Sequence, residues 1–367
     1  SDYNTGWMNG DIKLATLSST DTTNISASGN TNLLSGGWTN NGSFPYETFT
    51  QSGLNITSAI NTSAYGALNK TWTAVPGRTY TAYFNLTLNS GVAPRLFVQT
   101  TSSFGNGIEY QTVNGVNCFT FRATLSSSSY FTFATSNGDA TNFSVANLEL
   151  YEGGVADRSV NGNGLQVFGT VTKTAVATGA ELMAYSGWGT NNYMLHSVSQ
   201  NYGSPAIVSF MGWQKVSDIS DYQYMASLID GTSGNMFGMS VNSGSVSEAG
   251  KPYFYDNVNS TLLATTRVDD GNWHFMVGVF DGTSKKIYID GELNVSATVT
   301  ALAMTNVTAT NVGFYSPTIT GTKQYFHLGS IALIRTSATV PSAEQIKKIY
   351  EDEKFLFQEN AKATLYG

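Results

Sequence analysis

The sequence predicts an all-β protein made of two jelly-roll β-sandwich domains and one short C-terminal helix. Alternating apolar and polar residues indicate strands with one buried face, as in the run that contains Trp273, Phe275 and Val277. Only 12% of the 367 residues are charged, about half the usual share, and 13% are aromatic. Such a composition is typical of pleated apolar sheets that are joined by polar turns.

The helix is predicted over residues 342–358. Ser342 is a suitable N-cap, and Gln345 three residues later completes the sequence of a capping box. Apolar residues at spacings of three, four and seven share one face of this helix, namely Ile346, Ile349, Tyr350 and Phe357. We expect this face to pack on a sandwich or on a neighbouring subunit.

Residues 31–153 are expected to form the first sandwich. An Asn-Leu-Leu stretch at 32–34 is followed by Trp38, and a Pro-Gly turn at 76–77 leads into a strand of alternating residues. Together these features resemble carbohydrate-binding-module-like sandwiches, which implies a β-sandwich of the kind that binds glycans. In some such modules an acidic residue near the position of Ala146 helps to hold a structural calcium, and this chain has no carboxylate there.

Residues 181–340 are expected to form the second sandwich. Its clearest element is a hairpin at 271–291, where two alternating strands flank the turn at 281–284 and a second tight turn follows. The Trp-His … Tyr-x-Asp-Gly pattern of this hairpin resembles laminin-G-like domains of the concanavalin A-like lectin and glucanase superfamily, which implies a jelly roll. That family often has a histidine at the position of His274, for which we expect a structural role. The predicted core positions are Trp213, Trp273, Phe275, Ile287 and Ile289.

The other segments are predicted to connect or extend the sandwiches. Residues 1–30 are interpreted as a lead-in linker in which residues 7–15 could make one short strand, because positions 18–30 are almost entirely Ser, Thr, Asn, Asp and Gly. Residues 154–180 are expected to be a connector with a strand or two. Residues 341–367 are expected to hold the C-terminal helix and a tail.

Charge and hydropathy disfavour two classes of partner. The net charge is −7, and a chain with so few cations is poorly suited to neutralising the phosphates of nucleic acid. The sequence has no apolar run of about 20 residues of the kind that spans a bilayer. We therefore expect neither nucleic-acid binding nor membrane insertion.

Catalytic signals are also weak, and we expect a protein without enzymatic activity. Glycoside hydrolysis needs two carboxylates a few ångströms apart, whereas the dense acidic cluster at 351–353 lies on the predicted helix. His196, His274 and His327 have no metal-ligand spacing.

Glycan recognition is the positive expectation, because sugar rings stack on aromatic faces and sugar hydroxyls bond to amides. Loops of both sandwiches combine these residue types. The candidate glycan contacts are Trp38, Asn41, Tyr46, Tyr65, Trp72, Trp188, Tyr193, Tyr253 and Tyr255. The alternative for Trp38 and Trp72 is a place in the sandwich core.

A structural calcium is a further hypothesis. Asp218, Asp221 and Asp230 lie in expected loops, and calcium prefers oxygen ligands from such segments. The alternative is that these carboxylates are solvated turn residues. No other cofactor is expected.

The order of the parts indicates a biological setting. The two sandwiches are joined through an Asp-Arg-Ser-x-x-x-Asn-Gly-Leu stretch at 157–165, and the chain ends with Ser-Ala-Glu-Gln-Ile at 342–346. This arrangement resembles tailed-phage structural proteins, which implies a tail fibre or capsid appendage on the extracellular surface of a virion. A host cell-surface glycan or receptor and other virion proteins would then be the partners.

The resemblance also implies a homo-oligomer, most simply a trimer. Phe355, Leu356 and Phe357 near the end of the helix support it, because we expect little core for them to fill. Two alternatives remain open at this point. In the first alternative, the chain is a purely structural decoration or spacer protein of the virion. In the second, it is the non-catalytic binding segment of a polysaccharide-degrading enzyme.

Overall fold

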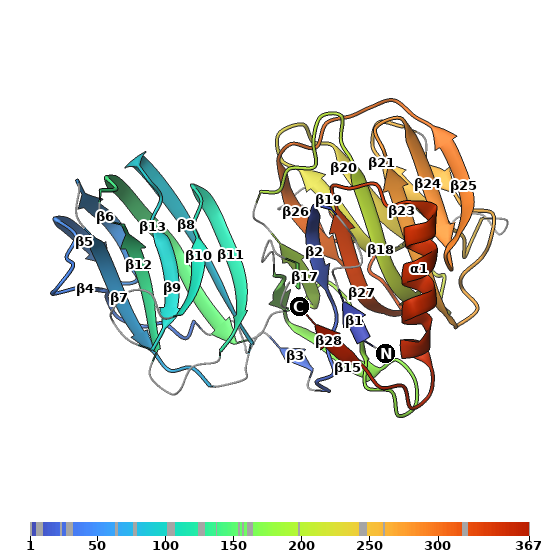
Figure 1. Ribbon diagram of the computed structural model, residues 1–367, viewed down its shortest axis with the longest axis horizontal. Coiled ribbons are helices and arrows are strands. Elements are labelled where there is room, and N and C mark those ends of the chain that lie inside the picture. The colour runs from blue at the N-terminus through green and yellow to red at the C-terminus, as the bar shows by residue number, and fades with distance from the viewer. Residues whose placement is uncertain are drawn as a thin grey trace. The chain divides into compact units, whose positions relative to one another are not determined.

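The computed structural model describes residues 2–366, except for 5–9, 23, 27–31, 63–64, 76–78, 101–106, 124–128, 137, 153–154, 156–157, 160–163, 197–198, 242–247, 260 and 318–321. The chain divides into two compact units (Figure 1). The small unit spans Ala27–Gly154, and the large unit combines Ser1–Ser26 with Val155–Gly367. The described residues are mostly strands with one short helical segment, so the predicted all-β class is confirmed.

The small unit is a sandwich of two antiparallel sheets. Its described strands form two five-stranded sheets, in the orders β10-β9-β12-β7-β4 and β11-β8-β13-β6-β5. Aromatic rings from both sheets meet between them, as where Phe84 packs against Phe133 with ring centroids 5.2 Å apart. The strands are β4 (Thr39–Asn40), β5 (Thr48–Ser52), β6 (Asn55–Asn61), β7 (Gly66–Trp72), β8 (Thr79–Gly91), β9 (Arg95–Gln99), β10 (Gly107–Gln111), β11 (Gly115–Arg122), β12 (Ser129–Thr135) and β13 (Thr141–Glu152).

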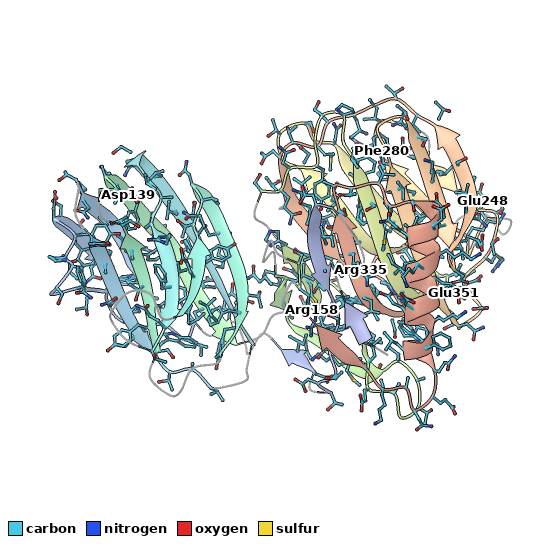
Figure 2. All side chains as sticks on the ribbon, in the orientation of Figure 1. Asp139, Arg158, Glu248, Phe280, Arg335 and Glu351 are labelled. Atoms are coloured by element: carbon cyan, nitrogen blue, oxygen red, sulfur yellow. The ribbon has the colours of Figure 1, made fainter. Side chains whose placement is uncertain are left out.

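The large unit is a second sandwich. Among the described residues, a seven-stranded sheet has the order β14-β17-β26-β19-β20-β21-β22. It packs against a nine-stranded sheet of order β25-β24-β23-β18-β27-β16-β15-β3, in which β2 also pairs with β27. Phe237 and Phe280 meet between the two sheets at 4.9 Å, and Phe280 is fully buried (Figure 2).

The strands of the seven-stranded sheet are β14 (Gln166–Phe168), β17 (Tyr193–His196), β19 (Gln223–Asp230), β20 (Met236–Val241), β21 (Pro252–Asp256), β22 (Leu262–Leu263) and β26 (Val307–Val312). Those of the nine-stranded sheet are β2 (Ile12–Thr16), β3 (Ile25–Ser26), β15 (Thr170–Ala175), β16 (Met183–Ser186), β18 (Val208–Lys215), β23 (Trp273–Phe280), β24 (Ser284–Ile289), β25 (Glu292–Thr298) and β27 (Ser330–Ser337). Next to them, β1 (Asp2–Asn4) pairs in parallel with β28 (Thr364–Tyr366).

The C-terminal helix covers the outer face of the nine-stranded sheet (Figure 1). It consists of α1 (Ala343–Glu353) and the 3₁₀ turn η2 (Lys354–Phe357), and the predicted capping box between Ser342 and Gln345 is present. Ile346 and Ile349 are buried against the sheet. The apolar face therefore packs on its own sandwich.

The end of the helix differs from the expectation that its apolar residues lack a core. Leu356 is buried, and Phe357 stacks on Trp213 with ring centroids 4.2 Å apart. Phe355 alone of these three is exposed, at 49%. Local sequence does not show that the outer face of the sheet offers Trp213 as a partner, which is why this expectation was wrong for Leu356 and Phe357.

The short strand expected within residues 7–15 overlaps β2, but it is part of the large sandwich and not of a linker. Strand β2 pairs with β27, more than 300 residues later in the sequence, and Leu14 and Leu17 are fully buried in the large core. Strand β3 pairs with β15, so part of the expected connector at 154–180 belongs to the same sandwich. Composition alone does not reveal such a pairing, because it depends on a distant strand having a free edge.

Candidate functional site

The outer face of the seven-stranded sheet carries a group of tyrosines in ring contact, which we call the tyrosine cluster. Centroids of contacting rings in it lie 4.9 to 6.4 Å apart. The rings come from the start of β19 and the residue just before it, from β21, and from the segment between β26 and β27. The cluster consists of Tyr222, Tyr224, Tyr253, Tyr255, Tyr315 and Tyr325.

Small residues on the central strand β20 make room for these rings. Phe237 and Met239 of β20 point into the core, so Gly238 and Ser240 face outward. Strand register places Tyr224 of β19 and Tyr253 of β21 on either side of Ser240. A Cβ atom added to Gly238 would overlap the ring of Tyr224. The absence of side-chain bulk at Gly238 therefore allows Tyr224 to lie flat across β20.

The segment after β26 completes the cluster. Tyr315 and Gln324 form a pair of backbone hydrogen bonds of 3.0 and 2.9 Å, which bring Tyr315 and Tyr325 over the sheet. Tyr325 has a positive φ of 55°, an uncommon conformation for a bulky residue. Its carbonyl oxygen accepts a hydrogen bond from the backbone N–H of Tyr224. Backbone strain of this kind often occurs at ligand sites.

The cluster has a buried floor and an accessible rim. Tyr224 and Tyr253 are 4% and 5% exposed, whereas the other members are partly exposed. Burial raises the pKa of the Tyr224 and Tyr253 phenols, and it also raises the pKa of Tyr255 and Tyr315. These four phenols are therefore uncharged at neutral pH. The face offers apolar rings with polar hydroxyl tips.

A smaller aromatic group extends the same face. Tyr193 of β17 stacks on Phe168 with centroids 4.4 Å apart, and it contacts Phe314, the neighbour of Tyr315 in sequence. The ammonium of Lys323 lies 4.5 Å from the centre of the Tyr193 ring. Aromatic rings thus continue from the tyrosine cluster towards β17.

The structure brings together three of the predicted glycan contacts. Tyr253 and Tyr255 belong to the tyrosine cluster, and Tyr193 lies in the group beside it. Sequence reasoning missed the remaining cluster members. The pair Tyr222 and Tyr224 shows the same spacing of two as Tyr253 and Tyr255, a spacing that places both rings on one face of a strand.

Other predicted contacts are buried. Trp38, Tyr46 and Trp72 lie in the core of the small unit, and Trp188 lies in that of the large unit, each at most 7% exposed. A ring enclosed by protein cannot stack on a sugar, so all four are corrected to core residues, which for Trp38 and Trp72 is the alternative that the sequence left open.

The last two predicted contacts lie in the small unit. Asn41 is buried, and its side-chain oxygen accepts hydrogen bonds from the backbone N–H groups of Ser43 and Phe44. This amide therefore shapes its own loop. Tyr65 is 44% exposed beside Phe44.

Four of the predicted core positions of the second sandwich are buried, namely Trp213, Phe275, Ile287 and Ile289. Trp273 differs, because it is only partly buried at the edge of the helix-covered face. Its indole N–H donates to the carbonyl of Val176 at 2.9 Å.

The candidate calcium ligands do not form a site. Asp218 and Asp221 are exposed and accept hydrogen bonds from backbone N–H groups of their own turns. Asp230 is buried and accepts from the backbone N–H groups of Thr232, Ser233 and Asn306. No group of three or more metal-ligating side chains occurs in the described ranges. The three carboxylates are turn residues.

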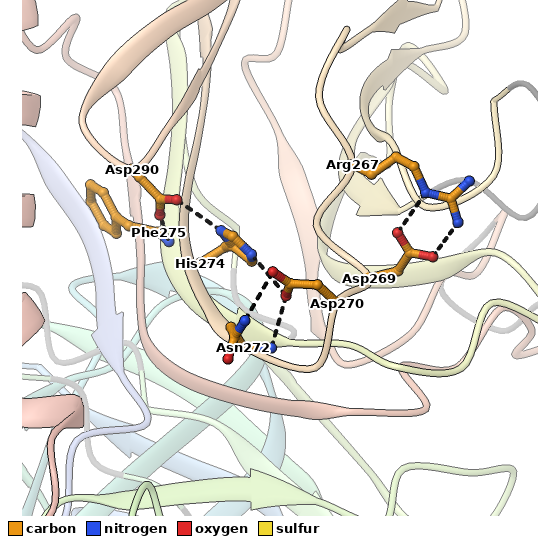
Figure 3. Close-up of polar contacts among 7 residues, drawn as sticks. All are labelled: Arg267, Asp269, Asp270, Asn272, His274, Phe275 and Asp290. Atoms are coloured by element: carbon orange, nitrogen blue, oxygen red, sulfur yellow. Dashed lines mark hydrogen bonds and ion pairs between the residues drawn. The ribbon is translucent and has the colours of Figure 1, made fainter.

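A separate polar arrangement surrounds His274 (Figure 3). Its Nδ1 lies 2.8 Å from a carboxylate oxygen of Asp290, and its Nε2 lies 3.1 Å from one of Asp270. The other oxygen of Asp290 accepts from the backbone N–H of Phe275 at 2.8 Å. His274 thus ties the turn before β23 to the turn after β24, in agreement with a structural role.

This arrangement predicts a pH-dependent stability. The carboxylate of Asp290, and then that of Asp270, raise the pKa of His274 above its ordinary 6.5 despite partial burial. His196 and His327 are buried, which lowers their pKa values to about 4 and keeps them neutral near pH 7. The stabilisation from protonated His274 is fully present below pH 6.5 and is lost as the pH rises through its raised pKa. We expect the free energy of unfolding to fall over that range.

Urea denaturation at a series of pH values from 6 upward measures the effect. In the variant His274→Gln, which cannot be protonated, the decrease should be absent. An equal decrease in wild type and variant would contradict the assigned role.

Comparison with known proteins agrees with the fold. Residues 188–347, which include the whole tyrosine cluster, match the model of the concanavalin A-like lectin/glucanases superfamily. None of the curated proteins matches the chain. In the described part of the chain, no helix is long and apolar enough to cross a membrane.

Similar solved structures include the binding domain of Paraclostridial Mosquitocidal Protein 1, with 9% identity, a TM-score of 0.42 and coverage of 54% of this chain and 49% of that one. A SAP-like pentraxin from Limulus polyphemus has 11% identity, a TM-score of 0.37 and coverage of 50% and 86%. The carbohydrate-binding module CBM40 of the Ruminococcus gnavus IT-sialidase has 16% identity, a TM-score of 0.32 and coverage of 43% and 96%. The chain spans about half the length of the first structure.

Proposed function

We propose that this chain is a non-enzymatic glycan-binding protein and that the tyrosine cluster of its large unit contacts the sugar. The observation that carries the proposal is the group of partly exposed tyrosine rings on the outer face of a lectin-like sheet. The C–H faces of a sugar pack on aromatic rings, and phenol hydroxyls exchange hydrogen bonds with sugar hydroxyls.

Two features favour a glycan over a protein receptor as the ligand. The rim consists of phenols, each with an apolar body and a polar tip, which matches the mixed surface of a sugar. The cluster is also packed over a regular sheet through Gly238 and Ser240, so its rings are held in place before binding. Such preorganisation reduces the entropy that a small ligand must overcome.

A glycan array with the whole chain tests the proposal. We expect saturable binding to a defined set of glycans, which are recovered without cleavage. Binding to a purified host surface protein whose glycans have been removed, with no glycan retained on the array, would contradict it. Release of reducing ends from a bound glycan would contradict the non-enzymatic part.

We further propose that the protein is displayed on the surface of a tailed-phage virion, in a tail fibre or capsid appendage, where it attaches to a host glycan. The resemblance of residues 157–165 and 342–346 to such proteins supports this setting. That resemblance and the exposed Phe355 also support assembly with other virion proteins as a homotrimer.

Light scattering of the purified chain tests the oligomeric state. We expect a mass three times that of one chain, and Phe355→Ser is expected to lower it. A single-chain mass at all concentrations would contradict the trimer.

A further inference from the structure

The rings of the tyrosine cluster face one another in two different ways. Tyr224, Tyr315 and Tyr325 are inclined to each other by 24° to 37°, with ring centroids 4.9 to 6.2 Å apart. The other contacting pairs of the cluster meet nearly edge to face, at 68° to 86°. These three phenol rings are therefore the members of the cluster whose edges a small shift can bring together.

Two of the three rings are open to solvent. Tyr315 and Tyr325 are partly exposed, whereas Tyr224 is 4% exposed at the floor of the cluster. Tyr224 is also fixed by β19, which pairs with β20 on one side and with β26 on the other. Tyr315 and Tyr325 lie between β26 and β27, so they can move towards each other without breaking a sheet. A reagent in solution therefore reaches this pair.

The backbone keeps this pair together. Tyr315 and Gln324 exchange the backbone hydrogen bonds described above, and further along the segment the N–H of His327 donates to the carbonyl of Gly313 at 2.9 Å. Between these two contacts there is one residue on the side of Tyr315 and two on the side of Tyr325. The additional residue bends the segment as in a β-bulge, and Tyr325 adopts its positive φ at this bend. Its ring centroid lies 5.9 Å from that of Tyr315.

Close phenols of this kind can couple covalently. One-electron oxidation and loss of a proton convert a tyrosine to a phenoxyl radical, whose unpaired electron is shared by the oxygen and the two Cε carbons. Two such radicals join through one Cε carbon of each ring. The joined rings are moderately twisted about the new bond, and the 37° inclination between Tyr315 and Tyr325 suits this geometry.

We propose that Tyr315 and Tyr325 form an oxidative modification site, at which a peroxide-dependent one-electron oxidant such as a haem peroxidase makes an intrachain dityrosine cross-link. Each phenol gives up one electron and one proton, and a bond forms between the two Cε carbons. The hydrogens on these carbons then move to the phenol oxygens, which restores both hydroxyls. The two electrons and two protons reduce one molecule of hydrogen peroxide to two waters.

The cross-link gives this chain a covalent constraint that its cysteine content does not provide. A single cysteine, Cys118, cannot form a disulfide within the chain. A bond between Tyr315 and Tyr325 closes a short loop in the segment between β26 and β27, and such closure stabilises a fold mainly by restricting the unfolded chain. The modification involves no ligand, so the proposal does not depend on glycan binding.

The test treats the whole chain, at low concentration, with a haem peroxidase and hydrogen peroxide. Trypsin cleaves after Lys323, so Tyr315 and Tyr325 fall in separate peptides, 287–323 and 324–335, unless they are joined. We expect a product with the mass of one chain less two hydrogen atoms, in which mass spectrometry finds these two peptides linked, together with the fluorescence of dityrosine. Coupling of a free tyrosine derivative in a parallel sample shows that the oxidant is active.

Two variants that keep the aromatic rings identify the coupled pair. Tyr325→Phe lacks the phenol, and we expect it to lose the intrachain dityrosine. Tyr255→Phe is the matched control, because Tyr255 also belongs to the rim but meets Tyr315 at 86°, and its cross-link yield should equal that of the wild type. The proposal is overturned if the active oxidant leaves the two peptides unlinked, if Tyr325→Phe forms as much intrachain dityrosine as the wild type, or if Tyr255→Phe loses it.

Discussion

Replacing Glu353 by glutamine should lower the free energy of unfolding of the large unit by about 3–5 kcal/mol. Glu353 forms an ion pair with Arg335 of β27, and its second oxygen accepts from the indole N–H of Trp213 at 2.8 Å. Arg335 and Glu353 are 1% and 4% exposed. Removing the carboxylate charge leaves the guanidinium of Arg335 in the protein interior without its counter-charge, which is strongly unfavourable.

Glu351→Gln on the same helix is the matched control. Glu351 pairs with Lys354, but both side chains are substantially exposed, at 47% and 33%. An exposed pair of this kind contributes little, and we expect a loss below about 1 kcal/mol. Urea denaturation of both variants measures the difference. Similar losses in the two would show that Glu353 does not hold α1 on the sheet.

The double substitution Tyr255→Ala and Tyr315→Ala should weaken glycan binding about tenfold or more, because each ring contact with a ligand contributes roughly 0.5–1.5 kcal/mol. Both rings belong to the accessible rim, so their loss removes stacking surface and two hydroxyls. Titration calorimetry with a glycan selected on the array measures the affinity. Leu293→Ala, which removes an exposed apolar side chain elsewhere in the large unit, is the control and should bind normally.

Gly238→Ala extends this prediction without removing any tyrosine. The added methyl group would displace the ring of Tyr224 from the floor of the cluster. We expect weaker glycan binding with the fold retained. Normal binding by both the double variant and Gly238→Ala would place the glycan elsewhere.

Local patterns in the sequence predicted the local elements correctly. The hairpin at 271–291 forms β23 and β24, and its second turn has positive φ at both Asp290 and Gly291, as an Asp-Gly turn requires. The capping box likewise located α1. What local patterns did not show is that β23 is covered on both faces. Phe275 and Val277 pack under α1, whereas Met276 faces the other sheet.

The candidate site was predicted only in part, for a similar reason. Tyr253 and Tyr255 stand out because they alternate on one strand. Tyr315 and Tyr325 lie between β26 and β27, outside any strand, and the backbone pairing of Tyr315 with Gln324 brings them to the same surface. No pattern of neighbouring residues in the sequence predicts that pairing. The residues around Trp38 have the composition of a binding loop, yet the Trp38 side chain lies in the core. Its exposure depends on which strands cover the ring, and the local sequence does not show this.

The most direct test of the central claim is a crystal structure of the whole chain with a glycan selected on the array. The account predicts a sugar ring packed on the tyrosine cluster, in contact with the rings of Tyr255, Tyr315 or Tyr325. A glycan bound to the large unit at another surface, with the tyrosine cluster unoccupied, would contradict it.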